Sequence, residues 1–383
     1  MLIATNPYNG QQLEGFPSLD KDEMYARIGD ASAAFTGWRT TSFAERANVL
    51  KAVAQQLRAE KQDIAELMAL EMGKPIKEGV PEVEKAATCA EYYADHAEAY
   101  LADETLPSDA SLSYVTYQPL GTLLGILPWN APLWLAFRYL APALMVGNTC
   151  VMKHDPHVPR SAQAIANAFL KAGAPDNIMV NLPLETPEVE LAIRDPRIAA
   201  VSFTGSNSAG KKVAAIAGSE VKPCVLELGG SDPVLVLNDA NLEQAADIIC
   251  LSRIINAGQS CIAAKRVIVE ADVHDRFIEL VEQRLGKLRL GDPLQADTDI
   301  GPIAREDLQL NLHRQVEETI AAGAKCLLGG HLPEGAGFFY PVTLLTCVTP
   351  PMCAFREETF GPVMVIIRAD DVDQAQHAQR HAE

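Results

Sequence analysis

The sequence has no apolar run long enough to cross a membrane, and its first residues lack the basic and hydrophobic regions of a signal peptide. Basic residues are also scarce: 32 Lys and Arg stand against 50 Asp and Glu, which gives a formal net charge of −18. So acidic a chain does not suit a general nucleic-acid binder or a protein that binds anionic membranes. We therefore expect a cytoplasmic protein with neither kind of partner.

Cysteine pairs of the C-x-x-C type are missing as well. The 8 cysteines are scattered, and the 8 histidines show no metal-type spacing with them. This pattern argues against zinc ligation and indicates reduced thiols, most of them core residues. Cys261 differs from the others because its loop, Gly258-Gln259-Ser260-Cys261, is rich in glycine and small polar residues.

The chain is long and apolar enough for two domains, with 383 residues of which 48% are hydrophobic. Helical patterns span about residues 20–38, 42–72 and 77–101. Ser42 and Glu45 have the spacing of a capping box at the start of the second. These helices are expected to pack around a nucleotide-binding domain.

The stretch from residue 112 to 127 predicts a β-hairpin, because an alternating segment is followed by a turn and an apolar return. Beyond it, strand and helix patterns alternate, which predicts a parallel sheet covered by helices, with ligands at the carboxyl ends of the strands. Strands are expected at residues 150–152, 178–180, 199–203 and 224–226, and helices at 160–172, 187–193 and 206–217.

An acid and a thiol follow in two glycine-containing loops. Glu227 opens Glu227-Leu228-Gly229-Gly230 after an apolar run, and Cys261 lies beyond the next helical segment. This pair has the chemistry of a thiol nucleophile with a general base. The alternative is a buried cysteine and a surface glutamate, which is the commoner fate of both residue types.

Other candidate residues stand where predicted strands end or begin. In Phe203-Thr204-Gly205-Ser206 a strand gives way to a helix, whose N-terminus could bind a pyrophosphate. Lys153 could bond ribose hydroxyls or be a solvated lysine, and Asn130 could stabilise an oxyanion or be a turn residue. The loop of residues 357–362 places an acid and an aromatic just before a strand at 363–367.

Together these segments resemble the aldehyde dehydrogenase superfamily over nearly the whole chain, most closely the pattern of its succinate-semialdehyde dehydrogenases. The motifs occur in the family's order and approximate spacing: Pro128-Trp129-Asn130, Lys153, Phe203-Thr204-Gly205-Ser206, Glu227-Leu228-Gly229-Gly230, Gly258-Gln259-Ser260-Cys261 and Glu358-Thr359-Phe360-Gly361-Pro362. The resemblance implies an α/β fold with a Rossmann-like NAD(P)-binding domain, a β-hairpin oligomerisation arm and an α/β catalytic domain, assembled as a homodimer or homotetramer. The expected limits are residues 1–110 and 128–227, 111–127, and 228–383, respectively.

The resemblance also implies roles for the site residues. Cys261 would attack an aldehyde to form a thiohemiacetal and then a thioacyl-enzyme, while the Asn130 amide and the Cys261 N–H hold the oxyanion. Glu227 would activate the water that hydrolyses the thioester. The residues implied in binding the dinucleotide are Trp129, Lys153, Gly205, Ser206, Gly210, Leu228, Glu358 and Phe360.

Substrate and cofactor preference depend on two further positions. Arg138 stands where semialdehyde enzymes of the family bind the substrate's distal carboxylate; the alternative is an arginine that pairs with an acid of its own chain. Some semialdehyde enzymes have a second arginine shortly before the nucleophile, and Ile255 occupies that position here. Arg253 is nearby but does not align with it. Pro156 replaces an acid usual in NAD-preferring members, and His154, His157 or Arg160 could attract a 2′-phosphate, whereas the neighbouring Asp155 favours NAD. We expect NAD or NADP, with NAD slightly favoured.

The ending departs from the family's pattern, because residues 376–383 do not look like its usual continuation, so the fold is expected to be C-terminally short. Two hypotheses follow: an active NAD(P)-dependent aldehyde dehydrogenase for a short semialdehyde, or an inactive scaffold of the same fold that only binds nucleotide. A cysteine hydrolase without nicotinamide is disfavoured by Lys153, Ser206 and Glu358.

Overall fold

The computed structural model describes residues 1–379, and the chain divides into two compact units. The first unit contains residues 1–4, 13–68 and 79–228, and the second contains residues 5–12, 69–78 and the chain from Gly229 on. Each unit is built on its own five-stranded β-sheet. Residues 380–383, part of the atypical ending expected from the sequence, lie outside the described residues.

The sheet of the first unit is parallel throughout, in the strand order β5-β4-β3-β6-β7. Its strands are β3 (Thr122–Leu127), β4 (Thr149–His154), β5 (Met179–Asn181), β6 (Ile198–Thr204) and β7 (Cys224–Glu227). The chain runs outward from β3 to β5 and then returns to β6 on the other side of β3. The strand order therefore reverses between β3 and β6, and sheets of this kind bind ligands beside the carboxyl ends of strands at such a point.

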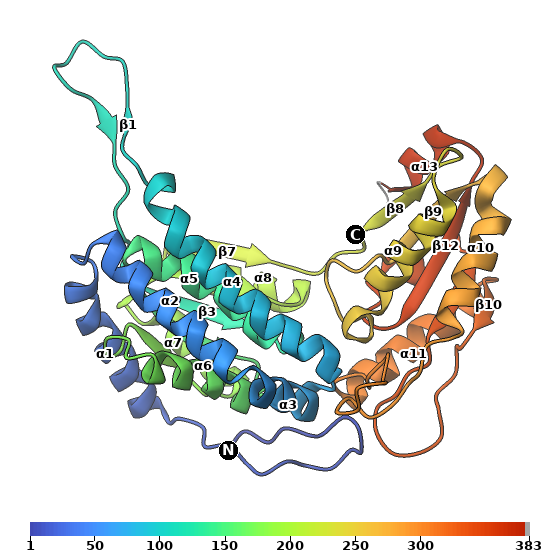
Figure 1. Ribbon diagram of the computed structural model, residues 1–383, viewed down its shortest axis with the longest axis horizontal. Helices are drawn as coiled ribbons and strands as arrows, with labels where there is room; N and C mark the ends of the chain where they lie inside the picture. The colour runs from blue at the N-terminus through green and yellow to red at the C-terminus, as the bar shows by residue number, and fades with distance from the viewer. Residues whose placement is uncertain (380–383) are drawn as a thin grey trace. The chain divides into compact units, whose positions relative to one another are not determined.

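Helices cover both faces of this sheet (Figure 1). On one face, α1 (Lys21–Trp38), α7 (Val189–Arg194) and α8 (Asn207–Ser219) share a buried apolar cluster with the strands. On the other, α5 (Pro132–Val146) lies so close to β3 that a Cβ on Gly125 would be 2.4 Å from the Tyr139 ring. Only glycine permits that approach. The remaining helices of this part are α2 (Phe43–Ala59), α3 (Lys61–Met72), α4 (Ile76–Tyr100), α6 (Pro159–Lys171) and the short 3₁₀ helix η1 (Thr186–Glu188).

The expected helices at residues 20–38 and 77–101 are confirmed as α1 and α4. The single helix expected over 42–72 is wrong: the chain breaks at Glu60, whose φ of −108° and ψ of 12° are not helical, and divides into α2 and α3. Glu60 is neither glycine nor proline, so nothing in the local sequence marks this break. The predicted capping box is formed, with the Ser42 Oγ accepting the Glu45 N–H at 3.2 Å and the Glu45 carboxylate accepting the Ser42 N–H at 2.7 Å.

The hairpin expected between residues 112 and 127 is wrong in its pairing. β2 (Tyr114–Val115) pairs antiparallel with β1 (Glu104–Thr105), and this ribbon extends away from the rest of the first unit in Figure 1. Residues 122–127 instead form the central strand β3, parallel to β4 and β6. A short apolar run fits both the second strand of a hairpin and a strand of a parallel sheet that is buried on both faces. The sequence therefore could not identify the strands that pair with it.

The sheet of the second unit has the order β10-β11-β12-β9-β8, parallel except for the edge strand β10. Its strands are β8 (Pro233–Val236), β9 (Arg266–Glu270), β10 (Lys325–Leu328), β11 (Thr343–Thr346) and β12 (Val363–Ala369). Its helices are α9 (Leu242–Ile254), the 3₁₀ turn η2 (Ile255–Gly258), α10 (Ala271–Leu285), α11 (Glu306–Ala321), α12 (Cys353–Arg356) and α13 (Val372–Gln379).

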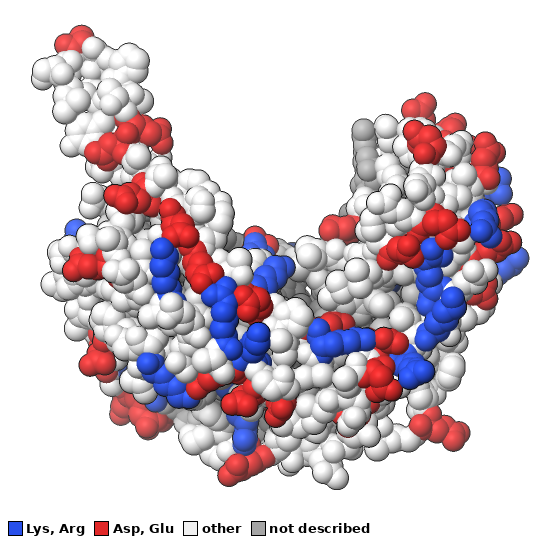
Figure 2. All heavy atoms as spheres, viewed as in Figure 1, with Lys and Arg blue, Asp and Glu red and all other residues white. Residues whose placement is uncertain are grey.

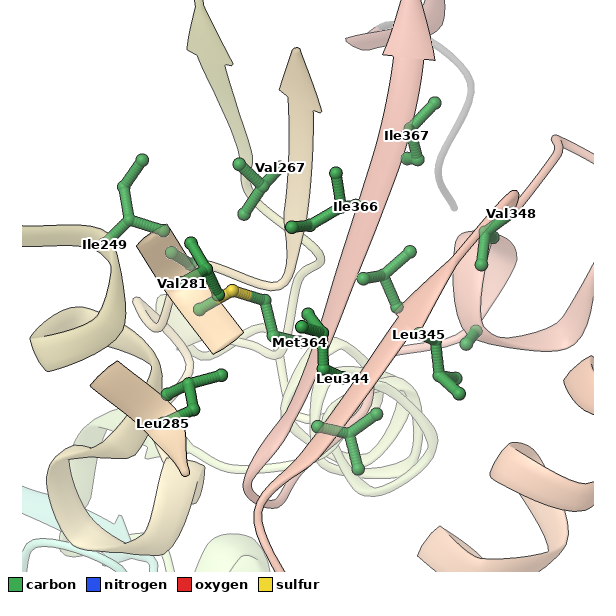
Figure 3. Packing of buried hydrophobic residues seen from close by; sticks show 14 of the residues in the cluster. Ile249, Val267, Val281, Leu285, Leu344, Leu345, Val348, Met364, Ile366 and Ile367 are labelled. Atoms are coloured by element: carbon green, nitrogen blue, oxygen red, sulfur yellow. The ribbon is translucent and has the colours of Figure 1, made fainter. Parts of the chain in front are cut away.

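The core of the second unit forms between this sheet and its helices. Figure 3 shows Val267 of β9, Met364 of β12 and Leu344 of β11 on the same side as Val281 and Leu285 of α10. All five are buried, and each such side chain contributes about 1.5–3 kcal/mol by leaving water. This core fixes the ends of β9 and β12, which carry the loops of Cys261 and Glu358.

The predicted α/β fold with two sheet domains is therefore confirmed. None of the helices within residues 1–379 is long and apolar enough to span a membrane. On the face shown in Figure 2, acidic and basic side chains are interspersed. Ion pairs are common in the described chain, such as those of Arg58 with Glu84 and Glu91.

Candidate active site

The residues predicted to form the site lie in both units. The first unit carries Asn130, Arg138 and Glu227, together with the positions expected to bind nucleotide at the carboxyl ends of β4 and β6. The second carries Cys261 and the loop of Glu358. Each group has a geometry of its own.

The Pro128-Trp129-Asn130 loop follows the carboxyl end of β3, and its Trp129 and Asn130 are buried, each 8% exposed. The helix after it, α5, is held at its first turn by Glu82 of α4. One oxygen of Glu82 accepts the N–H groups of Leu133 at 3.0 Å and Trp134 at 3.2 Å. A carboxylate here satisfies N–H groups that have no partner within the helix and suits the positive end of its dipole. Sequence reasoning missed Glu82, because it lies on a distant helix.

His154, the last residue of β4, lies against the same loop. Its ring faces the backbone of Pro128 and Pro132, although neither contact has full hydrogen-bond geometry. The ring is buried, and burial lowers the pKa of His154 to about 4, so it is neutral near pH 7. The attraction of a 2′-phosphate by His154 stays a prediction, and the buried ring brings no positive charge to it in this structure.

Arg138 and Glu227 form an ion pair. Nη2 of Arg138 on α5 lies 3.3 Å from Oε1 of Glu227, the last residue of β7. Their side chains are 42% and 51% exposed, so the pair is weak and open to exchange with another partner. Pairing with an acid of the same chain was the alternative considered for Arg138, and that acid is the predicted general base.

The turn after β6 has the features of a pyrophosphate-binding helix start. Ser206 caps α8, its Oγ accepting the Ala209 N–H at 3.4 Å. Further along α8, a Cβ on Gly210 would lie 2.5 Å from a Leu228 methyl group. Two of the predicted cofactor residues thus pack against each other directly, and a larger side chain at position 210 would displace Leu228.

Lys153 stands near the carboxyl end of β4, opposite Ile126 of β3, and is 5% exposed. Burial lowers the pKa of Lys153, and the carboxylates of Asp155 and Glu188 counteract this effect. Arg160, another candidate for a 2′-phosphate, donates to the backbone carbonyl of Glu14 at 2.9 Å and also meets its carboxylate.

These residues fit a dinucleotide. The first turn of α8 presents backbone N–H groups suited to a pyrophosphate, and Lys153 offers ammonium donors to ribose hydroxyls two strands away in the same sheet. Within the described chain, no group of three or more His, Cys, Asp or Glu is placed to hold a metal ion.

The nucleophile segment begins with an unusual turn. After α9, three residues in succession have positive φ: Asn256 at 56°, Ala257 at 52° and Gly258 at 72°. Left-handed backbone is costly for residues with a Cβ, and such strain collects at functional sites. The turn is secured by the Glu78 carboxylate, which accepts the Asn256 N–H at 2.6 Å. It leads through Gln259 to the half-buried Cys261.

The loop of Glu358 is joined to the nucleophile segment by two buried cations. Nζ of Lys265 donates to the Cys261 carbonyl at 2.6 Å and lies 3.1 Å from Oε1 of Glu358. Arg253, which the sequence placed out of register, is fully buried and donates to backbone carbonyls of both loops. Phe360 follows in the same loop and is half-buried.

Sequence reasoning did not single out Lys265. The available signal was its position: a lysine between Ala264 and the buried strand β9, where a solvated ammonium is improbable. Arg253 gave no comparable signal, since an arginine at the end of a helix is commonly exposed.

Comparison with known proteins agrees with this geometry. Residues 2–379 match the model of the family described as "Aldehyde dehydrogenase family". The chain is 45% identical over 381 residues to succinate-semialdehyde dehydrogenase [NADP(+)] 1 of Mycobacterium tuberculosis strain ATCC 25618 / H37Rv, covering 98% of this chain and 83% of the relative. It is 44% identical over 382 residues to succinate-semialdehyde dehydrogenase [NADP(+)] of Mycobacterium avium strain 104, covering 98% and 80%.

Solved structures are similar over the same extent. Succinic semialdehyde dehydrogenase from Streptococcus pyogenes, in complex with NADP+ as the cofactor, superposes with a TM-score of 0.96 at 32% identity, covering all of this chain and 84% of that one. A structure concerned with cofactor and substrate selection by Gox0499 gives a TM-score of 0.97 at 34% identity, covering 100% and 84%.

Proposed function

This chain belongs to the aldehyde dehydrogenase family, and we propose that it oxidises succinate semialdehyde, or a similar short semialdehyde, to the dicarboxylate with NADP+. The observation that carries the proposal is Arg138 beside Glu227, which places a carboxylate-binding fork next to the residue proposed as general base. The names of the similar mycobacterial enzymes support the same substrate and cofactor.

In the proposed reaction, the Cys261 thiolate adds to the aldehyde carbon, and the carbonyl oxygen becomes an oxyanion. The Asn130 side-chain amide and the Cys261 N–H are proposed to hold that oxyanion. When bound, the nicotinamide supplies the oxidant, because it accepts a hydride. The overall reaction converts aldehyde, water and NADP+ to carboxylate, NADPH and two protons. Glu227 is proposed to take a proton from the water that cleaves the resulting thioester, and the thiolate leaves.

Nucleotide binding is assigned to residues of both units. Lys153 is proposed to bond the adenosine ribose, Ser206 and the start of α8 the pyrophosphate, and Glu358 the nicotinamide ribose, with Phe360 beside the ring. Trp129, Gly205, Gly210 and Leu228 are proposed to shape the same site. NADP+ is proposed ahead of NAD+, in contrast to the slight preference for NAD expected from the sequence, because Pro156 replaces the acid usual in NAD-preferring members and because the similar mycobacterial enzymes are named for NADP(+).

Arg138 is the proposed ligand of the substrate's distal carboxylate. Since Arg138 also meets Glu227, a carboxylate that takes over the guanidinium would leave Glu227 without this partner. Binding of an acidic substrate would then free the proposed base for water activation.

We assign the β1–β2 ribbon, rather than the whole of residues 111–127, as an arm that pairs with a second copy in a homodimer or homotetramer. The nucleotide-binding domain then includes β3, and the catalytic domain begins near Leu228. A reducing, cytoplasmic setting is proposed from the eight cysteines, all of them free.

A burst experiment tests the function. The purified chain should release NADPH in a rapid phase followed by steady turnover when mixed with succinate semialdehyde and NADP+. Cys261→Ala should abolish both phases yet bind NADP+ with unchanged affinity, whereas Cys347→Ala, at an exposed cysteine, should behave as wild type. Binding of NADP+ without NADPH formation from any semialdehyde would instead identify a scaffold that only binds nucleotide.

A further inference from the structure

A buried lysine lies between the nucleophile and the nucleotide-binding carboxylate of the second unit. Lys265 is 1% exposed, and its ammonium touches both the Cys261 carbonyl and the Glu358 carboxylate, at 2.6 Å and 3.1 Å. Burial lowers the pKa of Lys265, and the charge of Glu358 counteracts this effect. Lysine is almost never buried unless it is paired, so the two contacts account for its position.

The carboxylate of Glu358 is confined on its other side by Gly229. A Cβ at position 229 would lie 2.1 Å from Oε2 of Glu358, so a side chain there would displace this carboxylate from its present position. The carboxylate is thus held between the Lys265 ammonium and the Gly229 backbone. Because an ionised carboxylate has about four acceptor positions, it can accept further hydroxyl groups without leaving Lys265.

The two loops are also tethered independently of Lys265. Nη2 of the buried Arg253 donates to the carbonyls of Gly258 at 2.9 Å and Thr359 at 3.0 Å, and also to that of Gly361. Loss of Lys265 would therefore leave the loops connected. What Lys265 adds is a direct contact from the backbone of Cys261 itself to the carboxylate of Glu358.

We propose that Lys265 is a positioning residue that couples the Cys261 nucleophile to nucleotide binding through Glu358. The inference rests on the proposed function, in which Glu358 binds the nicotinamide ribose. When a nucleotide fixes the Glu358 carboxylate, the Lys265 ammonium is fixed with it, and so is the Cys261 carbonyl that this ammonium holds. The reactivity of Cys261 therefore responds to nucleotide only while Lys265 is present.

The test uses the full chain as wild type, Lys265→Met, Glu358→Gln and the double variant. Methionine retains most of the apolar stem of lysine, and glutamine retains the shape of glutamate without its charge. Lys222→Met is the matched control, because the Lys222 ammonium also binds backbone carbonyls, those of Ile193 and Asp195, at the opposite end of β7. The measurements are the Kd of NADP+ by calorimetry, the rate of Cys261 alkylation by iodoacetamide with and without NADP+, and the Tm.

Each single variant should weaken NADP+ binding about tenfold or more, as expected for loss of one charge-assisted contact. The double variant should bind no more weakly than the worse single variant, because both changes break the same pair. In wild type and Lys222→Met, NADP+ should change the alkylation rate of Cys261 at least threefold. In Lys265→Met, Cys261 should be alkylated at the same rate with and without NADP+.

Lys265→Met with an unchanged Kd and an unchanged response of Cys261 to NADP+ would overturn the proposal, and a lower Tm alone would identify a purely structural lysine. The proposal would also be contradicted if the loss of NADP+ affinity in the double variant equalled the product of the losses in the two single variants. If wild type bound no NADP+ and reduced none with succinate semialdehyde, the proposed function would fail, and this inference with it. Wild-type turnover with an uncoupled Lys265 would refute the inference alone.

Discussion

Arg138 is the residue at which substrate choice can be separated from chemistry. Arg138→Ala should raise the KM for succinate semialdehyde about tenfold, near the lower end of the roughly 1.5–3 kcal/mol of a charge-assisted contact, because the side chain is 42% exposed. For butanal, which has no carboxylate, the KM should not rise, since Arg138 then makes no contact with the substrate. Steady-state kinetics with both aldehydes decide the matter.

Arg138→Lys is the matched variant, since it keeps the charge and loses the planar fork. It should recover only part of the affinity for the semialdehyde. An equal loss for butanal in Arg138→Ala would show that the ion pair with Glu227 serves the structure rather than the substrate.

At the scale of elements, the turn after α9 depends on Gly258. Its φ of +72° and the position of Gly361, whose carbonyl oxygen would lie 2.2 Å from a Cβ, both exclude a side chain. Gly258→Ala should cost about 2–4 kcal/mol of unfolding free energy, from left-handed strain and overpacking together, and should lower kcat by displacing Cys261.

Gly10→Ala separates these two causes. Gly10 has a φ of +73°, but a Cβ there would meet nothing within 4 Å. It should cost only about 1 kcal/mol and leave kcat unchanged. Urea denaturation and turnover of both variants test this, and equal costs would mean that the contact with Gly361 does not restrain the turn.

The start of α5 depends on Glu82 in a similar way. Glu82→Ala removes the acceptor of two backbone N–H groups and should destabilise the protein by about 1–3 kcal/mol. Because this helix follows Asn130 directly, kcat should fall more than KM changes. Glu82→Gln, which retains one acceptor oxygen, should lose less of both; a variant that lost stability with full kcat would show that Asn130 is held by other contacts.

The motifs were predictable because each is a local signal. The change from strand to helix at residues 203–206 follows from patterns within a few residues, and it is confirmed by β6 ending at Thr204 and α8 beginning at Asn207. What joins the motifs was not predictable: Glu82, Lys265 and Arg253 act on partners that the sequence places far away or gives no reason to pair. The misassigned strand β3 has the same origin, since periodicity identifies an apolar strand but not its neighbours.

For the molecule as a whole, the division into units matches a division of tasks under the proposed function. The first unit supplies Lys153, the start of α8, Asn130 and Glu227, and the second supplies Cys261 and Glu358. Each unit carries buried titratable groups beside these residues, Lys153 and His154 in the first and Lys265 in the second. His154 is the clearest example in the first unit.

The pKa of His154 is lowered by burial from 6.5 to about 4, so the native state keeps this ring neutral while the unfolded chain protonates it below about pH 6.5. The contribution of His154 to stability is therefore fully present above pH 6.5, its pKa in the unfolded chain, and is lost as the pH falls toward about 4, its pKa in the folded chain. Between pH 6.5 and 5, His154 alone should remove on the order of 1.5 kcal/mol of unfolding free energy. Urea denaturation at several pH values in this range should show that the unfolding free energy falls less steeply with decreasing pH in His154→Leu than in wild type. His96→Leu, at an exposed histidine on α4, should keep the wild-type slope. An unchanged slope in His154→Leu would mean that the buried ring accepts a proton in the native state, with its second N–H donated to the backbone of Pro128 or Pro132.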